Sequence, residues 1–189
     1  MITFLTKAAP TTLYAAILLG AAPFAQAETP KVGQKAPDFK LPLLGKGETR
    51  LSKLTRKGPV VLVVLRGFPG YQCPFCTRQV GDFMANSADF EKAKAQVLFI
   101  YPGPGTDLQK HADEFVKGQT MPIGFSFSLD PDYKFTNLYD LRWDAQAETA
   151  YPCTFIIGRD GKVKFAKISH EHGDRISAKD VVKQLSMAM

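Results

Sequence analysis

The sequence predicts an α/β domain with a central mixed β-sheet flanked by helices. Three observations support this fold class. The apolar, β-branched runs at 59–67 and 96–101 are typical of strands buried on both faces. Segments of helical composition lie between the predicted strands, which is the alternation expected of a parallel sheet. Two strands around the turn residues Arg159, Asp160 and Gly161 then add an antiparallel part.

The first half of the chain supplies the middle of this sheet. Residues 31–42, KVGQKAPDFKLP, form an extended lead-in punctuated by prolines, and ETRLSKL at 48–54 predicts a short strand that runs into a turn. The strand at 59–67 is followed at once by the cysteine-containing stretch GYQCPFCTRQ. From Cys76 the composition is helical as far as Ala95, with apolar residues recurring on one side.

The second half repeats the alternation and closes with a helix. Thr106 and Gln109 form a capping-box pattern at the start of one predicted helix, and Gly118 ends that helix. Ser177 is the predicted cap of the last helix. The predicted elements are a strand at 96–101, a helix at 106–118, a strand at 125–130, a helix at 131–141, a hairpin at 152–169 and a helix at 177–189.

The segment at 1–27 has the pattern of a secretory signal peptide. A single charge, Lys7, precedes a short apolar run, and the small residues of AQA stand before Glu28. The run is short for a membrane span. We therefore predict a signal peptide at 1–27, one domain at 28–189 and a periplasmic or secreted protein. The alternative is a protein anchored in the membrane by an uncleaved N-terminal segment.

The chain is basic, with a formal net charge of +6 at pH 7. Its lysines and arginines are scattered along the sequence and form no stripe, whereas a nucleic-acid interface requires a clustered basic face. We therefore predict no nucleic-acid partner. A membrane contact is expected only through the N-terminal segment, if that segment is not cleaved.

Three cysteines are present, and Cys73 and Cys76 are separated by only two residues. A disulfide across so short a loop contributes little through loop-closure entropy, so the pair is chemical rather than structural. A tetrahedral zinc site would need further ligands from Cys153 and the histidines, and the sequence has no second Cys-x-x-Cys motif. No metal is predicted, and SHEHGD at 169–174 is expected to be a solvated loop.

The cysteine pair stands where a buried strand leads into a helix. The unpaired N–H groups and partial positive charge of a helix N-terminus favour a thiolate over a thiol. Pro74 lies between the cysteines, and its fixed φ suits the first turn of a helix. Two sulfurs this close can alternate between dithiol and disulfide. The sequence therefore predicts Cys73 and Cys76 as a redox-active catalytic pair that needs no other cofactor.

Four motifs in this order, VGQKAPDFKLP, PVVLVVLRGFP, CPFC and YPCTFIIGRDGKV, resemble the thioredoxin superfamily. The resemblance is to its peroxiredoxin-like, or redoxin, family (alkyl hydroperoxide reductase and thiol-specific antioxidant), and it covers nearly all of the chain after residue 27. It implies a thioredoxin-like fold in which the cysteines lie at a helix N-terminus after a central strand. It also implies a cis-proline that faces the cysteines, at Pro152.

The motif fits two branches of this superfamily. The stretch from Pro69 to Cys76 resembles the peroxiredoxin motif Pro-x-x-x-Thr-x-x-Cys. In this alignment Cys73 stands at the threonine position and Cys76 at the position of the peroxidatic cysteine. In thioredoxin-like dithiol enzymes the first cysteine attacks a disulfide and the second resolves the mixed disulfide. The nucleophile is therefore Cys76 in one interpretation and Cys73 in the other.

The arginine that peroxiredoxins usually carry just before the TF strand is absent, because Pro152 stands there. Stabilising the charge that develops on a peroxide would need another cation, and Arg66 and Arg78 flank the motif. Cys153 is either a third redox sulfur or a small buried strand residue. The candidate substrate-binding residues are Arg66, Pro152 and Cys153.

The predicted activity is that of an exported thiol-dependent oxidoreductase that reduces peroxides. The Cys76 thiolate attacks the peroxide and becomes a sulfenic acid, Cys73 condenses with it to a disulfide, and an external dithiol reductant restores the pair. The alternative is thiol–disulfide exchange, in which Cys73 attacks a protein disulfide; the missing arginine favours this reaction. A non-catalytic alternative is a copper carrier that binds through the two cysteines and a histidine.

Overall fold

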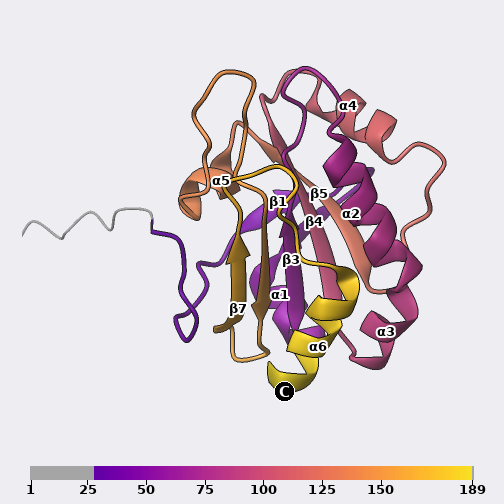
Figure 1. Ribbon diagram of the computed structural model, residues 1–189, viewed down its shortest axis with the longest axis vertical. Coiled ribbons are helices and arrows are strands. Elements are labelled where there is room, and N and C mark those ends of the chain that lie inside the picture. Colours follow the sequence, from indigo (N-terminus) through magenta and orange to yellow (C-terminus); the bar gives the residue numbers. More distant parts are fainter. Residues whose placement is uncertain (1–27, 189) are drawn as a thin grey trace, which may run out of the picture.

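A five-stranded mixed sheet forms the centre of the fold (Figure 1). The computed structural model describes residues 28–188. The strand order is β5, β4, β3, β6, β7, with bounds β3 Val60–Val64, β4 Gln96–Gly103, β5 Phe125–Pro131, β6 Cys153–Ile157 and β7 Val163–Ile168. A small separate sheet pairs β1 Lys40–Pro42 with β2 Glu48–Arg50. The helices are α1 Leu51–Lys57, α2 Pro74–Ala85, α3 Ser87–Lys92, α4 Leu108–Phe115, α5 Lys134–Leu138 and α6 Ala178–Ala188.

Strand β3 lies in the middle of the sheet and joins its two parts. It pairs in parallel with β4, which pairs in parallel with β5. On its other side β3 pairs antiparallel with β6, which forms a hairpin with β7. All five residues of β3 are buried, as the unbroken apolar run predicts. The chain therefore leaves β3 at the carboxyl end of the sheet's centre, where ligands of open α/β sheets bind.

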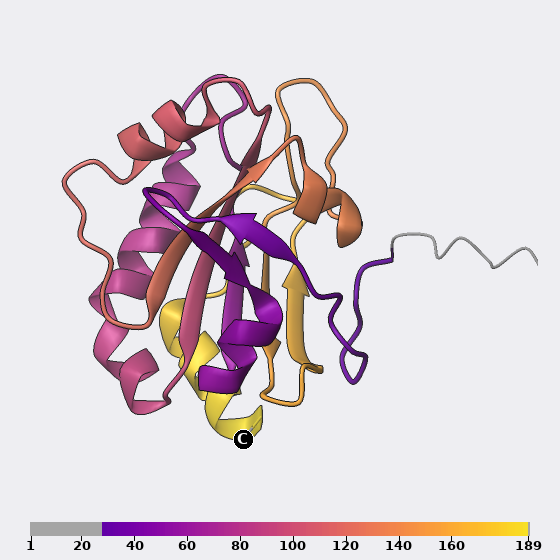
Figure 2. The ribbon, with the colours of Figure 1, turned by 180° about the vertical axis from the view of Figure 1, so that it is seen from behind.

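Alternate residues of β3 face two separate apolar layers. Val61 and Val63 pack with side chains of α2, α3, α4 and α6. Val60, Leu62 and Val64 pack with side chains of α1 and α5. In Figure 1 the helices α2 and α6 lie in front of the sheet, and Figure 2 shows α1 with β1 and β2 on the opposite face. The predicted sheet with helices on both faces is confirmed.

Two helical regions differ from the prediction. The turn expected within 48–54 is instead the start of α1, because Leu51 and Leu54, three residues apart, both bury against the sheet. The single helix expected from Cys76 onward is two helices, α2 and α3, which meet at Asn86. The Asn86 amide donates to the carbonyl oxygen of Asp82 at 2.8 Å, and this side-chain bond competes with continuation of the helix.

The helix caps were predicted in part. The N-cap of α4 is Asp107, with a φ of +59°, so the prediction of Thr106 is wrong. Gln109 donates along the helix to Asp113 and does not reach back to form a capping box. The cap of α6 is confirmed, because Ser177 Oγ accepts a backbone N–H of the first turn at 3.2 Å.

The predicted signal peptide and the alternative anchor, both at 1–27, lie outside the described residues. Within the part of the chain that the structure describes, no helix is long and apolar enough to cross a membrane. The boundary between residues 27 and 28 stays a prediction.

Gly67, in the loop that leaves β3, should tolerate no side chain. Its φ is +74°, and a Cβ there would lie 1.8 Å from the carbonyl oxygen of Pro102. We expect Gly67→Ala to lower the free energy of unfolding by about 2–4 kcal/mol, because the backbone must shift and alanine is strained at positive φ.

Gly81→Ala is the matched control, because Gly81 lies within α2 and its Cβ position has open space around it. This change should raise the free energy of unfolding by about 0.5–1 kcal/mol through helix propensity. Urea unfolding followed by circular dichroism measures both variants. Equal effects of the two substitutions would contradict the steric argument.

Candidate active site

The loop after β3 delivers the two cysteines to the start of α2. Cys73 is the N-cap residue of α2 and Pro74 is its first residue, as predicted. The backbone N–H of Thr77 donates to the carbonyl oxygen of Cys73 at 3.1 Å, so Cys76 lies within the first turn. Both cysteines are free thiols, with exposed fractions of 1% and 0%. The structure therefore brings the pair together, reduced and buried, at a helix N-terminus.

Two donors point at the sulfur of Cys76. The backbone N–H of Arg66 donates to Sγ at 3.3 Å, and Nη2 of Arg175 donates to it at 3.4 Å. Arg175 lies between β7 and α6, and its Nη1 also donates to Gln79 Oε1 on α2 at 2.7 Å. A guanidinium and a backbone N–H on one sulfur both favour its anionic form.

The two thiols differ in acidity. The pKa of Cys73 is lowered to about 5, chiefly by the hydrogen bond from the Cys76 thiol, with N–H groups of the first turn and the charge of Arg175 acting in the same direction. The pKa of Cys76 is raised, chiefly by burial and then by its hydrogen bond to Cys73, although Arg175 and the Arg66 N–H oppose this. Because the two groups interact strongly, they lose their first proton as a pair. The directions of the two shifts place the first negative charge on Cys73.

The side chain of Arg66 points away from the sulfurs. Its guanidinium makes a bidentate pair with Glu148, at 2.7 Å from Nε and 3.0 Å from Nη2, and is only 2% exposed. The contact of Arg66 with Cys76 is therefore made by the backbone, not by the cation that the sequence singled out. Arg78, the other flanking cation, is exposed on α2.

Arg175 is the candidate site residue that the sequence analysis missed. It lies in GDRIS, just before the cap of α6, and no spacing relates it to the cysteines. The hairpin of β6 and β7 returns the chain to the carboxyl end of β3, and this topology brings Arg175 beside α2. The cation missing before β6 is thus supplied from after β7.

Pro152 and Cys153 differ from what the resemblance implied. The described residues contain no cis peptide bond, so the expected cis-proline at Pro152 is wrong; a trans X–Pro bond is the ordinary form, and the ladder of β6 starts regularly at the next residue. Cys153 lies opposite Val64 and packs in the layer of α1 and α5, whereas Cys73 and Cys76 pack in the layer of α2 and α6. Burial raises the pKa of the Cys153 thiol. Cys153 is therefore a buried strand residue whose side chain lies on the other face of the sheet.

A cavity of about 380 Å³ lies beside the pair, between α2 and the segment 173–177. It is lined in part by Phe75, Gln79, Arg175 and Ile176, so it shares Arg175 with the sulfur of Cys76. Phe75 is 36% exposed, and its ring packs against Gly173, which also lines this cavity. The cavity offers a substrate an apolar wall and a cation next to the dithiol.

The histidines of the SHEHGD segment contact other side chains of the protein, and His170 lies against the ring of Tyr151. His172 Nε2 lies 3.0 Å from Glu148 Oε1, and its ring lies 5.3 Å from that of Trp143. Trp143 stacks on Tyr151, with ring centroids 4.8 Å apart. Between residues 28 and 188, no group of three or more metal-binding side chains lies together. The copper-carrier alternative gains no support from this part of the chain.

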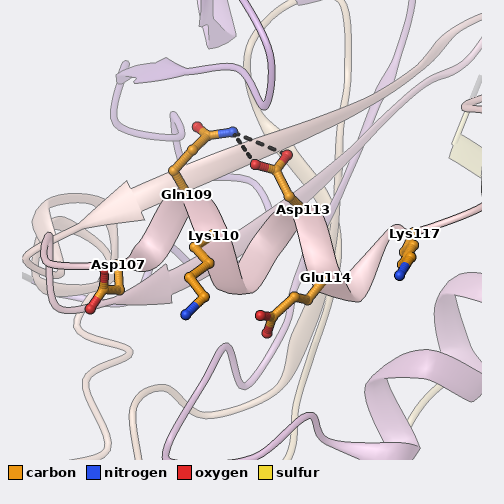
Figure 3. A pocket seen from close by; sticks show the side chains of 6 residues that line it. All are labelled: Asp107, Gln109, Lys110, Asp113, Glu114 and Lys117. Atoms are coloured by element: carbon orange, nitrogen blue, oxygen red, sulfur yellow. Dashed lines mark hydrogen bonds between the residues drawn. The ribbon is translucent and has the colours of Figure 1, made fainter.

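A larger hollow, of about 700 Å³, lies over α4 (Figure 3). Gln109 and Asp113 are joined by hydrogen bonds on one side of the helix, while Lys110 and Glu114 extend from the other side. Its lining consists of Asp107, Gln109, Lys110, Asp113, Glu114 and Lys117 and includes neither residue that donates to the sulfur of Cys76. The hollow is therefore separate from the redox pair.

The chain is similar in sequence to proteins named for peroxide and for disulfide chemistry. The model of the AhpC/TSA family matches residues 32–166. A Helicobacter pylori protein named as a peroxiredoxin, bcp, is 34% identical to this chain over 109 residues. The aligned region covers 58% of this chain and 65% of that protein. The thiol-disulfide oxidoreductase ResA of Geobacillus thermodenitrificans is 31% identical over 134 residues, which are 70% of this chain and 67% of ResA.

The fold is also found among solved structures. The crystal structure of peroxidoxin BcpB from Mycobacterium tuberculosis has a TM-score of 0.65 to this chain at 22% identity, covering 84% of this chain and 96% of that one. This likeness shows the thioredoxin-like fold. The sequence relatives carry names from both peroxide and disulfide chemistry, and the chain spans about two thirds of their length.

The hydrogen bond from position 76 should set the acidity of Cys73. In reduced Cys76→Ser the hydroxyl still donates, so the pKa of Cys73 should stay low; in Cys76→Ala the donor is lost, so this pKa should rise. A lowered pKa means that alkylation by iodoacetamide stays fast as the pH falls and slows only near about pH 5. The fall should begin at a higher pH in Cys76→Ala.

The measurement is the alkylation rate of Cys73 against pH, followed by mass spectrometry on each folded variant. Cys153 serves as an internal control, because its raised pKa keeps it a neutral thiol that should stay unmodified. The same midpoint in both variants would show that the residue at position 76 does not set this pKa.

Proposed function

Because the chain belongs to the AhpC/TSA family, we propose that it is a thiol-dependent oxidoreductase whose reactive centre is the dithiol of Cys73 and Cys76. Thiol–disulfide exchange is the reaction that the geometry supports best, with Cys73 as the attacking sulfur. One observation carries this choice: Cys73 caps α2, where the Cys76 thiol and the N–H groups of the helix lower its pKa. A sulfur of this kind is a thiolate at neutral pH and attacks a disulfide directly.

The proposed cycle transfers two electrons to the substrate. The Cys73 thiolate attacks one sulfur of a substrate disulfide, forms a mixed disulfide and expels the other substrate sulfur as a thiolate. Cys76 then gives up its proton, which the expelled thiolate takes, and attacks Cys73 Sγ. The mixed disulfide breaks, and the second substrate sulfur leaves as a thiolate. The products are the reduced substrate and the Cys73–Cys76 disulfide. An external dithiol reductant reverses these steps at the protein and restores the pair.

The surroundings of Cys76 suit the second step of this cycle. Burial raises its pKa, so Cys76 remains a neutral donor to Cys73 while Cys73 is the thiolate. Once Cys73 is bound in a mixed disulfide, Cys76 must become an anion, and Arg175 and the Arg66 N–H are already aimed at its sulfur. We propose that these two donors stabilise the resolving thiolate.

Peroxide reduction is the second candidate, and the same two donors on Cys76 favour it. In this reaction the Cys76 thiolate attacks a peroxide oxygen, the O–O bond breaks, and Cys76 becomes a sulfenic acid while the alcohol or water leaves. Cys73 then condenses with the sulfenic acid to give the same disulfide and water. Arg175 would stabilise the charge that develops on the peroxide. No metal, flavin or nucleotide is required in either reaction.

Single variants separate the two reactions. Reduced Cys76→Ser retains Cys73, and we expect it to form a stable mixed disulfide with a small aromatic disulfide at least about tenfold faster than a free thiol at about pH 5, because the free thiol is then almost fully protonated and Cys73 is not. Reduced Cys73→Ser retains Cys76 and should react slowly with the disulfide, because burial raises the pKa of Cys76 and keeps it a neutral thiol.

Brief exposure of both variants to a low peroxide concentration, with mass spectrometry of the sulfenic acid, completes the test. Fast oxidation of Cys76 in Cys73→Ser would make peroxide the substrate and Cys73 the resolving residue. If neither variant outpaces a free thiol with either reagent, the proposed function is wrong.

We also propose that residues 1–27 direct export and are removed, so that the dithiol works in the periplasm or outside the cell. The support is the pattern of Lys7, a short apolar run and AQA before Glu28. Expression of the full chain in a Gram-negative host and mass analysis of the periplasmic fraction test this proposal. The expected product begins near Glu28, whereas a full-length product in the membrane fraction would support the anchor.

A further inference from the structure

Glu148 holds two side chains that lie far apart in the sequence, those of Arg66 and His172. Its carboxylate accepts two hydrogen bonds from Arg66, at 2.7 and 3.0 Å, and its Oε1 lies 3.0 Å from Nε2 of His172. The Glu148 side chain is only 11% exposed, and that of Arg66 is 2% exposed. These charges are therefore shielded from water, which makes their pairing strong and the loss of one partner costly. The hydrogen bonds and charge of Arg66 outweigh burial and keep the pKa of Glu148 below its usual value.

Both residues are connected to the sulfur of Cys76 by hydrogen bonds, Arg66 directly and His172 through Arg175. Arg66, held by Glu148 through its guanidinium, donates its backbone N–H to Cys76 Sγ at 3.3 Å. The carbonyl oxygen of His172, held by Glu148 through its ring, accepts from Nε of Arg175 at 2.9 Å. Arg175 then donates Nη2 to the same Sγ at 3.4 Å. The contacts form a closed ring in which Glu148 and Cys76 lie on opposite sides.

We infer that Glu148 is a positioning residue for the dithiol, because it fixes from one carboxylate the two donors that contact Cys76 Sγ. Nothing in the structure places Glu148 itself on the sulfur, so it acts through Arg66 and Arg175. The inference rests on the proposed function, since it concerns the step in which Cys76 becomes a thiolate and attacks Cys73 Sγ.

The direction in which the rate of Cys76 attack changes, when the Glu148 charge is removed, distinguishes positioning from a direct electrostatic effect of that charge on Cys76. Removing a negative charge near Cys76 would by itself favour the Cys76 thiolate and accelerate its attack. Misplacing the two donors would disfavour that thiolate and slow the attack. The charged and titratable groups that face Glu148 are Arg66 and His172, and those near Cys76 are Cys73, Arg175 and Tyr101. A slower second step after loss of the Glu148 charge is therefore evidence for positioning.

The test uses the full chain, without residues 1–27 where they are cleaved, and the disulfide of 5-thio-2-nitrobenzoate as probe. Attack by Cys73 releases one coloured thiolate in a phase whose rate depends on probe concentration. Attack by Cys76 on the resulting mixed disulfide releases the second in a phase that is independent of concentration. The second phase reports Cys76 alone, because Cys73 is then uncharged.

We expect Glu148→Gln to slow the second phase about tenfold at neutral pH and to move its pH midpoint upward by about one unit. The first phase should change by less than about threefold. Glu148→Asp keeps the charge and should restore part of the rate. A second phase that is unchanged or faster in Glu148→Gln would overturn the inference.

Glu114→Gln is the matched control. Glu114 also pairs with a histidine, His111 Nδ1 at 3.4 Å, but it is half exposed on α4 and contacts neither sulfur. Both phases should be unchanged in this variant.

The double variant with Arg175→Met supplies a further check. Glu148→Gln should have little effect on the second phase once Arg175→Met has removed the stronger donor. Fully additive effects would show that Glu148 does not act through Arg175.

His172→Phe keeps the test decisive if Glu148→Gln does not fold. It retains a ring beside Trp143 and the backbone carbonyl that binds Arg175, and it removes only the contact with Glu148. A slower second phase is expected, and an unchanged one would overturn the inference. Failure of the proposed function looks different, because the wild-type protein would then lack a fast first phase at Cys73.

Discussion

The arrangement of the site depends on how the buried sulfur of Cys76 is satisfied. Leu65 still donates its backbone N–H to the sheet, at 2.9 Å from the carbonyl oxygen of Ile100, but Arg66 lies beyond the ladder. Its N–H is therefore free to donate to the sulfur, and the chain turns away at once through Gly67, where the positive φ suits glycine alone. The end of β3 and the start of α2 are thus fixed relative to each other by a contact to one reactive atom.

A second constraint follows from the charge buried beside that contact. The guanidinium of Arg66 needs an acidic partner away from water, and Glu148 supplies it from the connection between α5 and β6. The same carboxylate reaches His172 in the connection between β7 and α6. Two loops that are far apart in sequence are therefore tied to the carboxyl end of β3, where α2 begins. The polar contacts that satisfy a buried cation also organise the surroundings of the dithiol.

The sequence was informative where one local pattern decides the outcome. The apolar run of β3, the turn at Gly161 and the position of Pro74 at the start of α2 each follow from short-range rules, and all three were predicted. Arg175 could not be found in this way, because its place beside Cys76 results from the path of a hairpin and a loop. The face on which Cys153 lies was equally hidden, since it depends on the register of β6 against β3 and not on its neighbours in sequence.

The contact between Trp143 and His172 has a spectroscopic consequence. Trp143 is the only tryptophan of the chain, and its indole lies against the imidazole whose other contact is Glu148. An imidazole ring in contact with an indole alters the indole emission, and a displaced ring does not. The fluorescence of the unlabelled protein should therefore follow the position of the His172 ring. The molecule carries its own optical probe at the edge of the redox centre.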